Sequence, residues 1–177
     1  MIVICAAIIR QDGCLLLVEQ QGSDDAAPTW ALPGGVCEDG ELLSEALVRE
    51  VGEETGLRVD EIGPLRCLAQ VTRTPPESSS IAFVFDVNRW SGVVRSSDPD
   101  DLVRRAAFVS VAEAIDLLEA LPWRSMREPS VALLRSESGH GCVWLYEADD
   151  AGIERLVLCP RSLLSADLEQ PGVLHQS

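Results

Sequence analysis

The chain has 177 residues, of which 46% are apolar, so it can bury the core of one domain with a decorated end. Its formal net charge is −15, because 29 acidic residues outnumber 14 basic ones, and every base is an arginine. A chain this acidic, without a basic stripe, is a poor partner for nucleic-acid polymers. Small phosphorylated ligands are compatible with its charge, because arginine, backbone N–H groups or a bound metal can hold them.

Cysteine usage and the N-terminal apolar run indicate the compartment. The six cysteines are scattered, with no CxxC pair and no histidine at zinc-ligand spacing, so we expect reduced thiols in a cytoplasmic protein. Residues 1–9 lack a preceding basic residue and predict a buried strand rather than a signal peptide. No run approaches the roughly 20 apolar residues of a membrane span, so no membrane partner is expected.

Two strands and a helix are predicted for the first third of the chain. Residues 2–10 and 14–21 are rich in branched apolar side chains, and the Asp12-Gly13 pair between them is typical of a hairpin turn. From Glu41 to Thr55 no proline interrupts and good helix formers dominate. Gly56 follows where a left-handed helix terminator belongs, so the pattern predicts a helix over 41–55.

The remainder of the chain predicts further strands and helices. We expect strands at 65–73 and 80–88, a short strand near 106–110, a helix at 111–121, another short helix around Pro129, and a second hairpin that turns at 149–152. The hairpin carries alternating apolar residues that must be covered, so we expect it to extend a sheet edge or to form part of a homodimer contact.

The predicted helix over 41–55 belongs to a strongly acidic segment. Arg49 is the only base between Glu38 and Glu54, and the seven acids of that segment are Glu38, Asp39, Glu41, Glu45, Glu50, Glu53 and Glu54. Helical geometry places the last three within an arc of about 100°. Converging carboxylates recruit a cation or raise their pKa values, and hard oxygen ligands favour Mg²⁺ or Mn²⁺ over Zn²⁺. The alternative is a solvated helix face without a ligand.

The segment also carries a long motif of mixed chemistry. In order it contains Gly35, five residues, Glu41, seven residues, Arg49-Glu50, an apolar residue, one residue, Glu53-Glu54, one residue, Gly56 and an apolar residue. This is similar at every specified position to the signature of the Nudix hydrolases. The resemblance extends over about 2–134 and implies an α/β fold, an α/β/α sandwich with a mixed sheet. It implies a Nudix domain over 1–135 and a C-terminal extension over 136–177, with the hairpin and a tail.

The resemblance implies hydrolysis of a pyrophosphate bond in a nucleoside diphosphate linked to another group, such as an ADP-ribose-like compound, a nucleotide sugar or a nucleoside triphosphate. Glu50, Glu53 and Glu54 would hold Mg²⁺, or Mn²⁺ in its place, with the backbone carbonyl of Gly34. Arg49 would orient the carboxylates, and Glu41 would support the start of the motif. We expect Glu53 and Glu54 to be ligands rather than supports of the fold. The general base is left open between Glu53 and a carboxylate on a neighbouring loop.

Other positions depart from the family pattern or carry weaker signals. Arg105 stands three residues before Phe108, where relatives often carry a glutamate ligand. Asp98, Asp100 or Asp101 could supply an extra ligand instead, and the alternative is that these acids are solvated loop carboxylates. Arg73, at a strand end, is a candidate for binding a substrate phosphate. Two alternatives from other classes are a nucleotide-sensing module without turnover and a dimer scaffold without metal.

Overall fold

Two β-sheets and three α-helices make up the part of the chain that the computed structural model describes, residues 1–21, 27–95, 103–135 and 141–159. The elements are, in chain order, β1 (Ile2–Ile8), β2 (Arg10–Gln11), β3 (Cys14–Gln20), β4 (Thr29–Ala31), β5 (Gly34–Val36), α1 (Leu43–Thr55), β6 (Leu57–Thr72), the 3₁₀ turn η1 (Pro76–Ser78), β7 (Ser80–Gly92), β8 (Val103–Ser110), α2 (Val111–Glu119), α3 (Arg124–Arg135), β9 (Cys142–Ala148) and β10 (Glu154–Leu158). None of the described helices is long and apolar enough to cross a membrane.

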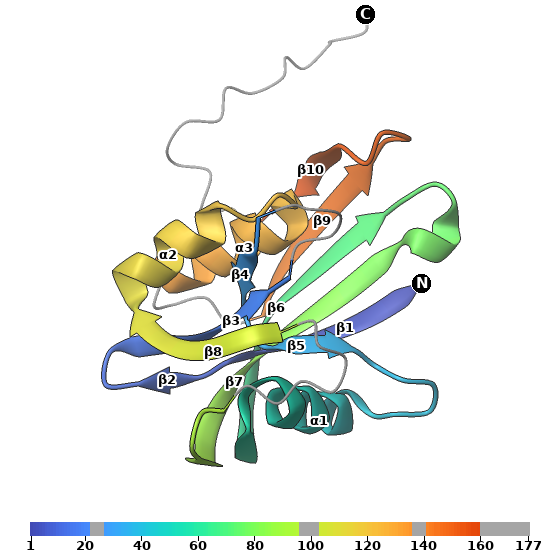
Figure 1. The fold of residues 1–177 in the computed structure, drawn as a ribbon. Helices are drawn as coiled ribbons and strands as arrows, with labels where there is room; N and C mark the ends of the chain where they lie inside the picture. Colours follow the sequence, from blue (N-terminus) through green and yellow to red (C-terminus); the bar gives the residue numbers. More distant parts are fainter. Residues whose placement is uncertain (22–26, 96–102, 136–140, 160–177) are drawn as a thin grey trace, which may run out of the picture.

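The larger sheet has six strands in the order β10-β9-β6-β7-β1-β5. It is mixed, because β1 runs parallel to β7 and β6 runs parallel to β9, whereas the remaining pairs are antiparallel. In the smaller sheet β3 pairs with β2, β4 and β8. The helices lie on two sides of these strands, with α1 on one and α2 and α3 on the other (Figure 1). The predicted α/β sandwich with a mixed sheet is confirmed.

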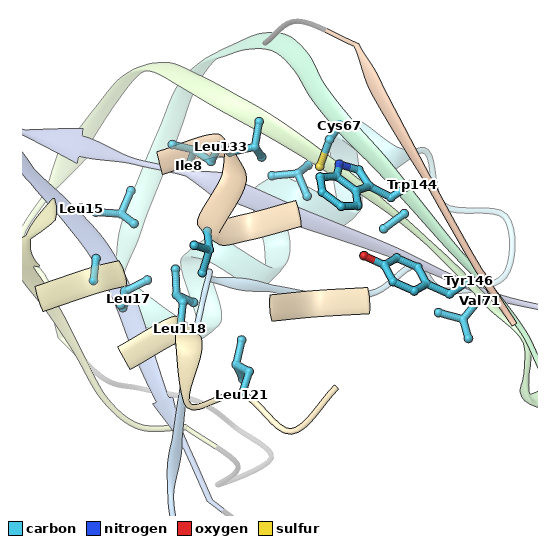
Figure 2. Close-up of a cluster of buried hydrophobic side chains, with 14 residues drawn as sticks. Ile8, Leu15, Leu17, Cys67, Val71, Leu118, Leu121, Leu133, Trp144 and Tyr146 are labelled. Atoms are coloured by element: carbon cyan, nitrogen blue, oxygen red, sulfur yellow. The ribbon is translucent and has the colours of Figure 1, made fainter. Parts of the chain in front are cut away.

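Alternate residues of β1 belong to two different hydrophobic cores. Cys5 and Ala7 pack with Leu47 of α1, whereas Ile8 packs with Leu118 of α2. Figure 2 shows the second core, which includes Ile8, Leu15, Leu17, Cys67, Leu118, Leu133 and Trp144. Because successive strand residues point to opposite faces, one apolar strand can support helices on both sides of the sheet.

Helix α1 begins two residues later than the predicted Glu41. Glu41 does not continue the helix, since its carboxylate accepts a hydrogen bond from the Glu38 backbone N–H at 3.0 Å and so closes the preceding loop. The Glu45 side chain accepts the Leu42 N–H at 2.9 Å and satisfies one donor of the helix start. At the other end Gly56 has φ = 72°, which confirms the predicted left-handed terminator.

The first apolar run splits between the two sheets. The predicted hairpin turn at Asp12-Gly13 is confirmed, with φ values of 49° and 77°, but it joins the short β2 to β3 rather than β1 to β3. The Leu16 N–H donates to the Ile9 carbonyl at 2.9 Å, where the chain passes from one sheet to the other. The predicted strand over 65–73 begins earlier, because β6 starts directly after Gly56 and contains several register shifts against β7.

The C-terminal hairpin extends the larger sheet at its edge. Strand β9 pairs parallel with β6, from Cys67 opposite Cys142 to Thr72 opposite Glu147, and β10 follows as the outer strand. Trp144 and Tyr146 are buried on the side of α3. Of the two expected roles, the structure therefore shows sheet extension. Residues 136–140 and 160–177 of the predicted extension lie outside the described residues.

Candidate catalytic site

Two glycines of β5 bring the backbone against both β1 and α1. Gly34 lies opposite Ala6 and Gly35 lies opposite Cys5 in the antiparallel pair. Gly34 has φ = 147°, and a Cβ at this position would lie 2.1 Å from the Cys5 carbonyl oxygen. No larger residue fits at Gly34 unless the β1–β5 pairing shifts.

Glu54 connects the last turn of α1 to β5. Its Oε2 accepts a hydrogen bond from the Gly34 backbone N–H at 2.7 Å, and the residue is only 6% exposed. This buried contact holds a helix and a strand together, so Glu54 has a structural contact in addition to the ligand role that the sequence analysis expects for it. A carboxylate has further acceptor positions, so the contact does not remove Glu54 from the candidate metal ligands.

Glu50 lies over Gly35. A Cβ built on Gly35 would be 2.5 Å from all three atoms of the Glu50 carboxylate, so the missing side chain of the glycine makes the space that the carboxylate fills. The Glu50 side chain is 14% exposed. Burial raises the pKa of the Glu50 carboxyl, although the nearby Arg49 acts in the opposite direction. A buried anion of this kind is stabilised by an added cation.

Arg49 joins the loop before the helix to two carboxylates of the helix. Its Nε and Nη2 each donate to one oxygen of Glu41 at 2.9 Å, while Nη1 donates to Glu50 at 2.8 Å and to Glu53 at 3.3 Å. This fork holds the pKa of the Glu41 carboxyl at about 2. Arg49 thus contacts Glu41, Glu50 and Glu53 together.

Glu53 is the more exposed of the two carboxylates of α1 that Arg49 contacts. Its side chain keeps 38% of its surface exposed, against 14% for Glu50. The three predicted ligands therefore differ in their surroundings. Glu54 is buried and bound to the backbone, Glu50 is partly buried beside Gly35, and Glu53 faces solvent, where it can reach a water molecule or a bound ligand.

The donor set fits a hard divalent cation in its chemistry, since it consists of carboxylates beside a strand backbone. Within the described ranges, however, no three or more His, Cys, Asp or Glu side chains are gathered closely enough to hold a metal ion. Arg49 contacts both Glu50 and Glu53, and Glu54 accepts the Gly34 N–H. A bound metal would therefore have to draw these carboxylates together and take the place of part of the Arg49 contact.

Arg73 lies on the opposite side of the sheet from α1. Its Nη2 is 2.6 Å from Oε1 of Glu154, whose side chain is 2% exposed. Arg73 also lines a cavity of about 260 Å³ with Trp123 and with apolar residues of β1, β6 and β7. Arg73, the predicted phosphate-binding residue, is thus held by Glu154 of the C-terminal hairpin. The sequence does not predict this contact. The signal for it is weak, because Glu154 stands at the start of β10 beside the charged Arg155.

Arg105 has two partners that suit an arginine rather than a metal ligand. Its Nε is 3.1 Å from Glu19 of β3, and its guanidinium lies 4.7 Å from the centre of the Trp30 ring. Asp98, Asp100 and Asp101, the candidates for the additional metal ligand, lie outside the described residues.

Comparison with known proteins agrees with this geometry. The NUDIX domain family matches residues 1–133. A MutT-like protein of Streptomyces ambofaciens is 31% identical over 66% of this chain and 75% of its own length, and the ADP-ribose pyrophosphatase of Methanocaldococcus jannaschii is 35% identical over 51% of this chain and 53% of its own. A crystal structure of a MutT protein from Bacillus halodurans shares the fold, with a TM-score of 0.65, 18% identity, and coverage of 88% of this chain and 97% of that one.

The chain therefore belongs to the Nudix hydrolase family. The family match ends within α3, so the β9–β10 hairpin lies beyond it. The motif from Gly35 to Leu57 occupies the β5–α1 unit, which is the site described above.

Proposed function

We propose that this Nudix hydrolase is a metal-dependent pyrophosphohydrolase that cleaves a nucleoside diphosphate linked to another group. The observation that carries the proposal is the position of Glu50, whose carboxylate fills the space above Gly35 while Arg49 holds it together with Glu53. An acidic surface with no ligand would not need a glycine to admit a carboxylate into a partly buried place.

Glu50, Glu53 and Glu54, with the Gly34 carbonyl, are the groups that would hold Mg²⁺, or Mn²⁺ in its place. When bound, such an ion neutralises phosphate charge and lowers the pKa of a coordinated water. Arg49 keeps the carboxylates oriented from the Glu41 side, and Glu53 is the residue best exposed to accept a proton from the attacking water. A carboxylate on a neighbouring loop is the alternative base.

The cavity beside Arg73 is the candidate site for the nucleoside part of the substrate. Its walls are mainly apolar, and Trp123 keeps 47% of its surface exposed, so its ring can stack on a base. Ile4 lines this cavity and pairs with Val36 of β5. The cavity and Gly35 of β5 therefore adjoin neighbouring residues of β1, Ile4 and Cys5, on opposite faces of the sheet. A substrate with its nucleoside in the cavity would reach the carboxylates with its phosphates by passing around the edge strand β5.

A panel of nucleotides tests the proposal. The full chain would be incubated with Mg²⁺ and ADP-ribose, nucleotide sugars or nucleoside triphosphates, and release of monophosphate or pyrophosphate would be measured. We expect turnover of at least one class and its loss in excess chelator. No turnover of any member with Mg²⁺ or Mn²⁺ would contradict the proposal.

The second candidate function is a nucleotide-binding module without turnover. One observation favours it, namely that the described residues do not present a ready group of three metal-binding side chains. Tight binding of a panel member without product release would distinguish the sensor from the enzyme.

We further propose small nucleotides as the partners, and a homodimer remains a hypothesis for the oligomeric state. The balance of 29 acids and 14 arginines argues against nucleic-acid polymers. The six cysteines are all free thiols, in keeping with the cytoplasmic location that we propose.

A further inference from the structure

One carboxylate of the C-terminal hairpin is buried at the nucleoside cavity, although the hairpin lies beyond the NUDIX match. Glu154, the first residue of β10, is 5% exposed. It contacts Arg73 at the end of β6 and Ser125 in α3, and both of these residues line the cavity of about 260 Å³. The hairpin therefore reaches a part of the molecule that the proposed function uses.

The two oxygens of Glu154 are used by well-defined donors. Oε1 accepts from Nη2 of Arg73 at 2.6 Å and from Oγ of Ser125 at 2.9 Å, and Oε2 accepts from the Ser125 backbone N–H at 2.7 Å. The Glu154 backbone carbonyl also accepts from Nη1 of Arg124 at 3.3 Å. A buried carboxylate with these partners is held in one position, and it holds its partners in turn.

The contact with Ser125 fixes the beginning of α3. Ser125 is the second residue of this 12-residue helix, whose first N–H groups have no partner within the helix. A carboxylate there satisfies one donor and interacts favourably with the positive end of the helix. Trp123, two residues before Ser125, and Met126, directly after it, form a wall of the cavity. Glu154 therefore sets where that wall lies.

The contact with Arg73 determines the charge of the cavity. Arg73 is the one charged side chain among the described residues that line it. Paired with Glu154, its guanidinium is neutralised and held at the wall, which leaves space for an uncharged nucleoside. Without Glu154 the guanidinium would be free to enter the cavity.

We propose that Glu154 is a positioning residue for substrate binding, through which the C-terminal hairpin shapes the nucleoside cavity and determines which nucleotides it accepts. This inference rests on the proposed function. It assigns no chemical step to Glu154, so the effect belongs to KM rather than to kcat.

The test compares E154Q and E154D with E147Q in the full chain. Glu147 lies in the same hairpin, but its contact with Arg155 is exposed at the surface, so E147Q is a matched control. With the best substrate of the panel and saturating Mg²⁺, we expect E154Q to raise KM about tenfold while kcat stays within about twofold, because the released guanidinium would occupy part of the cavity that the nucleoside needs. E154D should recover part of the loss, and E147Q should match the wild type. An unchanged KM in folded E154Q would overturn the inference.

A second variant covers the case in which E154Q does not fold, as judged by circular dichroism. R73M leaves the Glu154 carboxylate on Ser125 and removes only the guanidinium. We expect R73M also to raise KM with kcat retained, because the Glu154 carboxylate would then lie at the cavity without its guanidinium partner and repel an anionic nucleotide. A wild-type KM would overturn the inference.

A binding measurement separates failure of this inference from failure of the proposed function. If the wild type hydrolyses no panel member, ADP binding is followed by tryptophan fluorescence, with W123F identifying the contribution of the cavity. About tenfold weaker ADP binding by E154Q would support the role of Glu154 even in a protein without turnover. Equal ADP affinity in E154Q, or no ADP binding by the wild type, would overturn it.

Discussion

The Glu50 carboxylate lies within 2.5 Å of the point where a Cβ on Gly35 would stand. Gly35→Ala should therefore push the carboxylate out of its place. The added Cβ would meet the end of the flexible Glu50 side chain, so the fold can adjust. Moving a catalytic group by about 1 Å, however, can lower the rate roughly 100-fold. We expect kcat to fall by about that factor with little change in melting temperature. Steady-state kinetics and thermal unfolding of the same preparation would check this.

Gly52→Ala is the matched change for comparison. Gly52 lies inside α1 at an unspecified position of the motif, and a Cβ there would meet only the Leu57 carbonyl at 3.7 Å, an ordinary contact. Replacing a helical glycine by alanine should stabilise the protein by about 0.5–1 kcal/mol. Turnover should match the wild type. If G52A lost as much rate as G35A, an added methyl group would lower the rate wherever it is placed in the β5–α1 unit. The space above Gly35 would then have no special role.

The Arg49–Glu41 fork predicts a pH-dependent contribution to stability. The pKa of the Glu41 carboxyl is about 2 in the folded protein, below its usual value of 4.5. A lowered folded-state pKa stabilises the protein above pH 4.5, and this contribution is lost as the pH falls towards 2. We expect Glu41→Gln to lower the melting temperature at pH 7 and to approach the wild type near pH 2. A constant difference across that range would contradict the role of this carboxylate.

Removal of the metal should abolish turnover reversibly. Excess chelator is expected to stop hydrolysis, and millimolar Mg²⁺ or a lower concentration of Mn²⁺ should restore it. Activity should rise with pH, because Glu50, whose pKa is raised by burial, must lose its proton to act as a ligand. Full turnover in chelator would refute the metal dependence, and product release measured across pH 5–9 would test the direction of the pH effect.

The β5–α1 unit could be predicted from the sequence because its signals are local. Gly56 ends the helix where a left-handed residue is needed, and the i, i+3 and i+4 spacing places Glu50, Glu53 and Glu54 on related positions of one helix. Their different surroundings could not be predicted in this way. Whether a carboxylate of α1 is buried or exposed depends on its contacts with β5, which packs against the helix through Gly34 and Gly35.

Contacts between distant segments explain the remaining differences. Residues 2–10 form one apolar run, yet the chain changes sheets after Ile8, because Ile9 pairs its carbonyl with Leu16. Arg73 and Glu154 are 81 positions apart, and neither residue signals the other in the sequence. Glu154 is only a weak signal, because an acid at the start of a short strand does not identify its buried partner.

Whether the carboxylates of α1 serve catalysis rather than solvation can be measured by comparing the turnover of Glu53→Gln with that of Glu45→Gln at saturating Mg²⁺. Both changes remove one negative charge from the same helix, but Glu53 contacts Arg49 in the site, whereas Glu45 is exposed and accepts the Leu42 N–H, which a glutamine oxygen can also accept. We expect E53Q to lose on the order of 100-fold or more in kcat and E45Q to turn over like the wild type. Equal rates for the two variants would rule out a catalytic role for Glu53 and would show that the acidic segment is a solvated helix face.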